Sequence, residues 1–191
     1  MQDQKTIVVV SGIPRSGTSL MMSILGQAGI PLLTDDARAP DDSNPRGYFE
    51  LAAVRKTNED SAWLEQAPGQ AVKVIHRLLP ALPDEYHYRV ILMHRPVEEV
   101  VQSQDRMLAR LGADPTDLPT DRVQAIFKEQ HAQTRILLEN GAHFEWIEIA
   151  YPTLIQAPEA EIERVIRFLE LEAEVHDLAT AIDDRLYRER L

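Results

Sequence analysis

No cysteine occurs in this chain of 191 residues, and that absence excludes disulfide bonds, thiolate catalysis and cysteine-ligated zinc sites. It also suits a reducing compartment, so we expect a cytoplasmic protein. No apolar run approaches the ~20 residues of a membrane-spanning helix, so no membrane span is expected. The first residues, MQDQKTIVVVSG, have neither a basic flank nor a long apolar run. They predict a strand instead of a signal peptide.

Positive charge is scarce as well. Lys and Arg number 20 against 31 Asp and Glu, which gives a net charge of −11. A surface of this charge repels a nucleic acid duplex, so no nucleic acid partner is expected. An anionic ligand then needs positive side chains that are clustered locally. Hydrophobic residues make up 44% of the chain, and the length predicts one folded domain over residues 1–191. The oligomeric state stays open.

Strand and helix patterns alternate along the chain. The β-branched run at 6–11 (TIVVVS) is typical of a strand that is buried on both faces. The same reasoning predicts strands at 71–76, 88–93 and 144–149, and helices at 16–28, 51–65, 97–111, 121–139, 160–171 and 173–181. This order predicts a three-layer α/β fold, in which helices flank a central parallel sheet and ligands bind beyond the carboxyl ends of its strands. Segment 34–47 predicts a long loop. We interpret it as a solvated loop or a substrate lid, because its four aspartates fit no Ca²⁺ loop.

The first strand runs into a loop with two glycines five residues apart, directly before a helix. Such a loop points its backbone N–H groups and the helix dipole at an anion. Ser16, Thr18 and Ser19 add hydroxyl donors, and Arg15 adds a fixed positive charge. We therefore assign a phosphate-binding loop to Gly12, Pro14, Arg15, Ser16, Gly17, Thr18 and Ser19.

This loop lacks the lysine of nucleoside-triphosphatase loops, because Thr18 stands in its place. No apolar strand ends in the Asp that holds Mg²⁺ in those enzymes, so no metal is expected. A sulfuryl donor accounts for the difference, since a transferring sulfuryl group carries less charge than a γ-phosphoryl group. Two alternatives stay open: a nucleotide kinase or hydrolase on the same fold, and a non-catalytic nucleotide-binding module.

A second anion site is predicted where the strand YRVILM ends. Arg95 follows that strand at the same sheet edge as the loop, and Ser103 comes eight residues later in the next helix. The two side chains are candidates to hold one phosphate together. Taken alone, Arg95 is better explained as an ordinary surface cation and Ser103 as a solvated helix serine. His94, which points the other way from Arg95 by strand alternation, is interpreted as structural.

Together these segments resemble the sulfotransferase superfamily. GIPRSGTSLMM resembles its 5′-phosphosulfate loop and HRPVEEVVQSQ its 3′-phosphate motif, while NPRGYFE and WIEIAYPTL resemble further stretches of small bacterial members. The resemblance covers most of residues 6–171. It implies a P-loop NTPase-like fold and metal-independent, in-line transfer of a sulfuryl group from 3′-phosphoadenosine 5′-phosphosulfate (PAPS). The resemblance also implies that the acceptor is a hydroxyl or amine of a small molecule, a carbohydrate or a peptide.

The chain departs from the superfamily's cytosolic branch in two ways. Arg15 stands where that branch carries lysine, and an arginine stabilises the charge of the leaving group without giving it a proton. The glycine-rich carboxyl-terminal motif is also missing. The basic residues 185–190 either replace it or form a solvated end.

An attacking hydroxyl needs a base within hydrogen-bonding reach. His76 is one candidate, because it is expected to end a strand at the active edge and KVIH is similar to a Lys-Thr-His stretch of the cytosolic branch. Glu50 is the other, because further branches of the superfamily use a glutamate in this part of the chain. We prefer Glu50 on the resemblance. The alternative for Glu50 is a charge at a helix start, and for His76 a strand-end histidine bonded to a loop.

Overall fold

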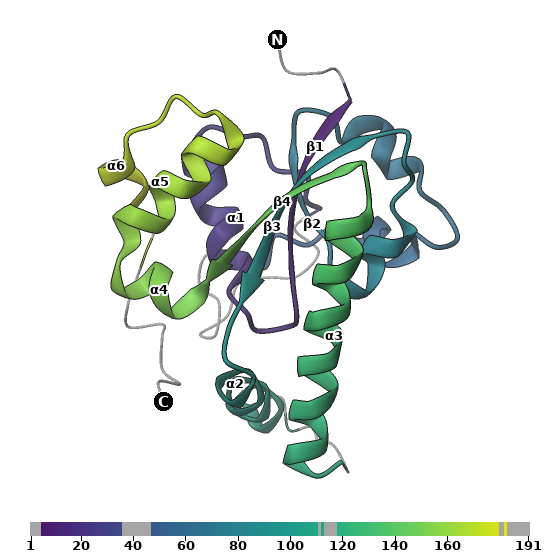
Figure 1. The fold of residues 1–191 in the computed structure, drawn as a ribbon, viewed down its shortest axis with the longest axis vertical. Helices are drawn as coiled ribbons and strands as arrows, with labels where there is room; N and C mark the ends of the chain where they lie inside the picture. Colours follow the sequence, from purple (N-terminus) through teal and green to yellow (C-terminus); the bar gives the residue numbers. More distant parts are fainter. Residues whose placement is uncertain (1–4, 36–46, 111, 113–117, 180–181, 183–191) are drawn as a thin grey trace.

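The computed structural model describes residues 5–35, 47–110, 112, 118–179 and 182. Within them, four parallel strands form one sheet in the order β2–β1–β3–β4 (Figure 1). The strands are β1 (Thr6–Gly12), β2 (Ala71–Lys73), β3 (His87–His94) and β4 (Phe144–Ala150). The helices are α1 (Thr18–Gln27), α2 (Val97–Arg110), α3 (Thr120–Asn140), α4 (Tyr151–Gln156), α5 (Pro158–Leu169) and α6 (Val175–Ala179). The predicted parallel α/β fold is confirmed.

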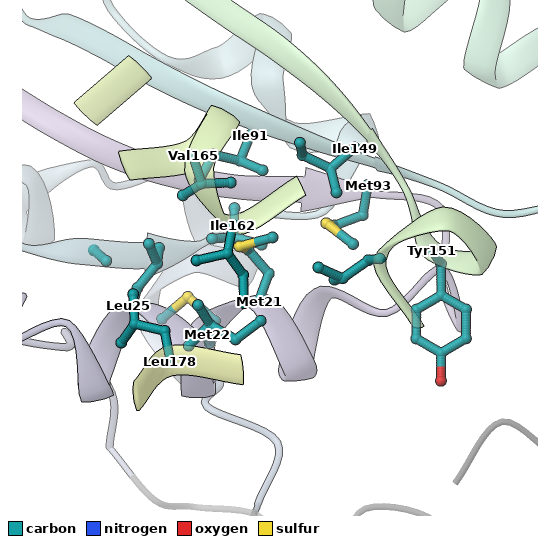
Figure 2. Packing of buried hydrophobic residues seen from close by; sticks show 14 of the residues in the cluster. Met21, Met22, Leu25, Ile91, Met93, Ile149, Tyr151, Ile162, Val165 and Leu178 are labelled. Carbon is teal, nitrogen blue, oxygen red and sulfur yellow. The ribbon is translucent and has the colours of Figure 1, made fainter. Parts of the chain in front are cut away.

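Alternating side chains of the strands build a core on each face of the sheet. From β3, Ile91 and Met93 pack with α1, α4, α5 and α6 on one face (Figure 2). Val90 and Leu92 of the same strand pack on the other face with Trp63 and with Leu138 of α3. Helices therefore cover both faces, which explains the continuous apolar runs of β1 and β3.

The register of the parallel strands brings their carboxyl ends to one edge. Gly12 of β1 lies opposite Met93 of β3, and Val10 of β1 lies opposite Lys73 at the end of β2. His94 of β3 lies opposite Ala150 at the end of β4. This edge carries the loop that follows β1 and the start of α2, so the predicted site residues converge there.

The expected helix at 51–65 is wrong. Two short 3₁₀ segments, η1 (Ala52–Lys56) and η2 (Ala62–Gln66), stand there instead. Between them, the Asp60 carboxylate accepts a hydrogen bond from the Ala62 backbone N–H at 3.0 Å. Such side-chain bonds to nearby backbone compete with helical ones. A short helix that was not expected, α4, begins at Tyr151, directly after β4.

Other expectations fall partly outside the described residues. The predicted loop at 34–47 is described only at residues 34, 35 and 47, and the basic segment 185–190 is not described. No helix within the described ranges is long and apolar enough to cross a membrane.

Candidate functional site

The loop between β1 and α1 has a backbone that only glycine accepts easily at two points. A Cβ on Gly12, whose φ is 153°, would lie 2.7 Å from the Met93 carbonyl oxygen. A Cβ on Gly17, whose φ is 98°, would lie 2.3 Å from a ring carbon of Tyr151. Arg15 is also left-handed, with a φ of 69°. A non-glycine residue in this region is uncommon and costs free energy, which the surroundings must offset.

The hydroxyl of Ser16 is a buried donor without a described partner. Ser16 is 0% exposed, and its Oγ makes no hydrogen bond to any described residue. Buried polar atoms are normally hydrogen-bonded, so an orphan hydroxyl within a loop of this shape fits an anion as its partner. The loop also leads into the amino-terminus of α1, where backbone N–H groups favour negative charge.

Arg15 and Ser103 meet at this edge, although 88 residues separate them. The Arg15 Nε donates a hydrogen bond to the Ser103 Oγ at 3.1 Å. Ser103 is only 4% exposed. The loop and α2 are therefore joined directly through two of the predicted site residues.

Arg95 is buried at the same junction. Its Nε donates to the Glu99 carboxylate at 2.9 Å, and its Nη1 donates to the Arg15 carbonyl oxygen at 3.3 Å. Its guanidinium lies 4.8 Å from the centre of the Tyr151 ring. Arg95 and Ser103 thus both contact Arg15. Their joint grip on one phosphate stays a prediction.

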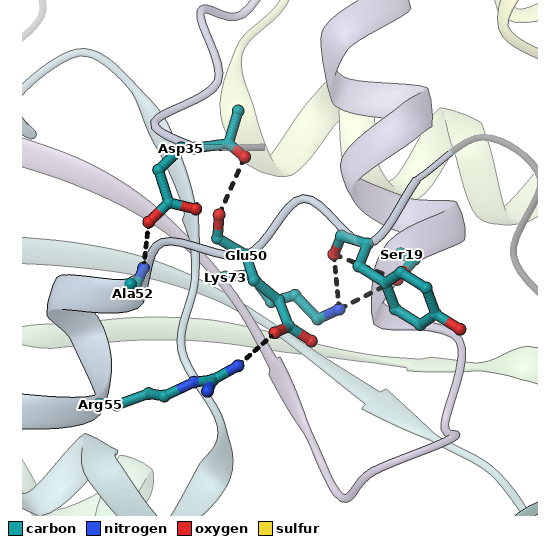
Figure 3. A network of polar contacts seen from close by, with 8 residues as sticks. Ser19, Asp35, Glu50, Ala52, Arg55 and Lys73 are labelled. Atoms are coloured by element: carbon teal, nitrogen blue, oxygen red, sulfur yellow. Dashed lines mark hydrogen bonds and ion pairs between the residues drawn. The ribbon is translucent and has the colours of Figure 1, made fainter. Parts of the chain in front are cut away.

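Lys73 is a cation of the site that the sequence analysis did not assign. Its ammonium donates to the Ser19 Oγ at 2.9 Å and to the Tyr48 carbonyl oxygen at 2.8 Å. Figure 3 shows these contacts in one network with Glu50. A lysine that ends an apolar strand next to β1 was the available signal. Its side chain reaches α1, which sequence spacing alone does not show.

Glu50 follows a constrained stretch of backbone. Gly47 has a φ of 96° and Phe49 a φ of 50°, which is rare for an aromatic residue. The Glu50 carboxylate accepts a hydrogen bond from Arg55 at 2.9 Å, and its side chain is 28% exposed (Figure 3). Its backbone oxygen accepts from the Thr34 hydroxyl at 2.9 Å. The residue is therefore anchored through its backbone, and its partly exposed carboxylate pairs with Arg55.

His76 does not end a strand, so that expectation is wrong. β2 ends at Lys73, and His76 begins the 3₁₀ segment η3 (His76–Ala81). Its Nδ1 lies 3.1 Å from the Gly12 carbonyl oxygen, and its Nε2 lies 3.0 Å from the Gln130 side-chain oxygen. The carbonyl accepts only, so Nδ1 carries a proton. The ring is therefore held against the start of the loop at Gly12. Burial lowers the pKa of His76 below the usual value near 6.5.

The edge therefore gathers positive side chains in a chain that is acidic as a whole. Arg15, Lys73 and Arg95 all lie at the carboxyl ends of β1, β2 and β3. Across the described part of the chain, no three His, Cys, Asp or Glu side chains are arranged to hold a metal ion. The donor set consists of N–H, hydroxyl and cationic groups, which suits an anion.

The sequence and the fold were compared with those of known proteins. No protein-family model matches the chain. A curated protein of Caenorhabditis briggsae, provisionally named protein-tyrosine sulfotransferase, is 26% identical over 189 residues. That match covers 87% of this chain and 66% of the relative, so the chain spans about two thirds of the relative's length.

Solved structures share the architecture at low sequence identity. The sulfotransferase domain of the Synechococcus PCC 7002 olefin synthase has a TM-score of 0.56 and 15% identity, over 97% of this chain and 80% of that chain. Mouse sulfotransferase SULT7A1, complexed with PAP, has a TM-score of 0.61 and 12% identity, over 99% and 68%. Retinol dehydratase, in complex with androsterone and inactive cofactor PAP, has a TM-score of 0.59 and 14% identity, over 97% and 66%. These similarities agree on the fold described above.

Proposed function

We propose that this chain, which has the fold of the sulfotransferase superfamily, transfers a sulfuryl group from PAPS to a hydroxyl acceptor. One observation carries the proposal: in the loop after β1, the buried Ser16 hydroxyl has no partner among the described residues, Arg15 belongs to the same loop, and Lys73 donates to Ser19 where the loop enters α1. Fixed donors of this kind stabilise charge that develops on a leaving oxygen. In this proposal the charge stabilisation comes from these donors.

Each predicted residue receives a part in this proposal. The loop from Gly12 to Ser19 would hold the 5′-phosphosulfate, and Arg15 would stabilise the leaving oxygen. Lys73 joins Arg15 as a second cation, since it is held beside Ser19. Arg95 and Ser103 would hold the 3′-phosphate. Support for this donor comes from two similar structures that are complexes with PAP.

The base is proposed to be Glu50. Its side chain is 28% exposed, whereas His76 is 6% exposed and both of its ring nitrogens lie at hydrogen-bonding distance from Gly12 and Gln130. A residue acting as base must reach the proton of the acceptor. His76 is kept as the alternative, since a bound acceptor can rearrange such contacts.

The acceptor class is proposed from chemistry and from similar proteins. The curated relative is named for tyrosine, and one similar structure contains androsterone. Tyrosine and androsterone both carry a hydroxyl, so we propose a hydroxyl of a small molecule, a carbohydrate or a peptide as the acceptor, with an amine as the alternative. A single domain over residues 1–191 and a cytoplasmic location are kept as parts of this proposal.

Nucleotide preference tests the proposal directly. Adenosine 3′,5′-bisphosphate at 100 times its dissociation constant should stabilise the protein by about 2.7 kcal/mol, which raises the melting temperature by about 5–10 °C. ATP should have a smaller effect, and adding Mg²⁺ should not increase it. The measurement is a thermal melt with each nucleotide. If ATP with Mg²⁺ stabilises the protein and the bisphosphate does not, a kinase or hydrolase is supported instead. If the bisphosphate binds but no sulfuryl transfer is detected, a non-catalytic module is supported.

Arg95→Ala tests the 3′-phosphate site. Removing this guanidinium should weaken binding of adenosine 3′,5′-bisphosphate by at least tenfold, because a charge-assisted bond is worth about 1.5–3 kcal/mol. Binding of adenosine 5′-monophosphate, which lacks that phosphate, should change little. Calorimetric titration of both nucleotides checks this. Equal losses for the two would show that Arg95 does not recognise the 3′-phosphate.

A further inference from the structure

Glu99 is a buried carboxylate with no part in the proposal so far. It is 2% exposed on the first turn of α2, whereas its neighbour Glu98 forms a surface ion pair with Lys128 at 3.0 Å. Burying a carboxylate is unfavourable unless it is paired. Glu99 accepts the Nε hydrogen bond of Arg95 at 2.9 Å, with both side chains at most 5% exposed. The pair is therefore part of the interior of the site.

The Arg95 guanidinium links three elements. Nε is held by Glu99 of α2, Nη1 donates to the Arg15 carbonyl of the loop, and the guanidinium lies over the ring of Tyr151 of α4. A guanidinium is planar, so fixing Nε also fixes the directions of its other N–H groups. The position of the Glu99 carboxylate therefore sets where Nη1 points.

The contact with Arg15 falls at the strained part of the loop. Arg15 has a φ of 69°, and its side chain is held separately by Ser103 at 3.1 Å. Strained backbone at a site persists only where surrounding contacts hold it. Two contacts do so here: Ser103 holds the side chain, and Arg95 holds the carbonyl.

We infer that Glu99 is a positioning residue of the donor site, which holds Arg95 so that Arg95 braces the Arg15 backbone and presents its guanidinium to the 3′-phosphate. The part that concerns the phosphate rests on the proposed function. The part that concerns the loop does not, because it follows from contacts within the chain.

Glu99→Gln is the test, because it keeps the size and removes the charge. We expect the affinity for adenosine 3′,5′-bisphosphate to fall about tenfold, the difference between a charge-assisted and a neutral hydrogen bond. Backbone amides of the loop at residues 12, 13 and 15–17 should exchange with deuterium faster, since local opening becomes easier. Glu98→Gln, on the same turn but at the surface, is the matched control and should change neither quantity.

A double variant shows whether Glu99 acts through Arg95. In an Arg95→Met background, adding Glu99→Gln should weaken nucleotide binding no further, because the group it positions is gone. Additive losses would overturn the inference, and so would a Glu99→Gln variant with unchanged or tighter binding and an unchanged loop exchange rate. If Glu99→Gln does not fold, Glu99→Asp keeps the charge with a shorter reach and should show a smaller loss of the same kind. If the wild-type protein does not bind the bisphosphate but Glu99→Gln still speeds loop exchange, the proposed function is wrong and the positioning role of Glu99 toward the loop stands.

Discussion

Arg15→Ala should lower sulfuryl transfer about 10²–10³-fold, the usual loss on removing one group that stabilises developing charge. The guanidinium lies on a loop whose backbone is fixed at a φ of 69°, and its Nε is held by Ser103. It is therefore placed before any substrate binds, and such preorganisation is what makes a cation effective in a site. Donor binding should weaken as well, because the same charge faces the bound anion. The measurement is single-turnover transfer to a verified acceptor.

Two further variants define what Arg15 supplies. Arg15→Lys keeps a positive charge without the planar fork, so it should recover part of the lost rate. Arg167→Ala removes an arginine that is 77% exposed on α5 and pairs with Glu163, so it should leave the rate unchanged. Near-wild-type turnover in Arg15→Ala would show that another group stabilises the leaving oxygen, and Lys73 would be the first candidate.

Much of the fold follows from patterns that are local in the sequence. β1 and β3 are apolar runs buried on both faces, and the loop between β1 and α1 is marked by Gly12 and Gly17. These signals depend on neighbouring residues only, so the sequence predicts them well. The helix predicted at 51–65 was wrong because the apolar spacing did not show that the Asp60 side chain competes with the helix by bonding nearby backbone.

Contacts between segments that are distant in the sequence could not be predicted from such local patterns. Lys73 reaches Ser19 across 54 residues, and His76 reaches Gly12 across 64. No spacing rule encodes either contact, because both depend on how β2 lies beside β1. Glu99 had a signal that was available: Glu99 and Ser103 are four residues apart, which places them on one side of α2, and Arg95 precedes Glu99 by four residues. Adjacent glutamates at 98 and 99 conceal it, because composition does not show which one points inward.

Replacing the base should produce the largest loss of all. Glu50→Gln keeps the size of the side chain and removes the carboxylate that would take the acceptor's proton. We expect turnover to fall about 10²–10⁴-fold with donor affinity intact, the range of general base catalysis. His76→Asn should lower turnover much less, since the ring already holds the Gly12 carbonyl and lies against Gln130. Rates are to be measured at saturating donor, with melting curves to confirm that each variant is folded.

Surface residues of the same types provide the controls. Glu65→Gln in η2 removes an exposed carboxylate, and His176→Asn removes an imidazole that is 87% exposed. Neither should alter turnover. A dead His76→Asn beside an active Glu50→Gln would assign the base to the histidine, and the lowered pKa of His76 would then keep its ring neutral and able to accept a proton at neutral pH. If both variants stay active, neither group is the base, and either a bound water takes the proton or the acceptor reacts in a form that is already deprotonated.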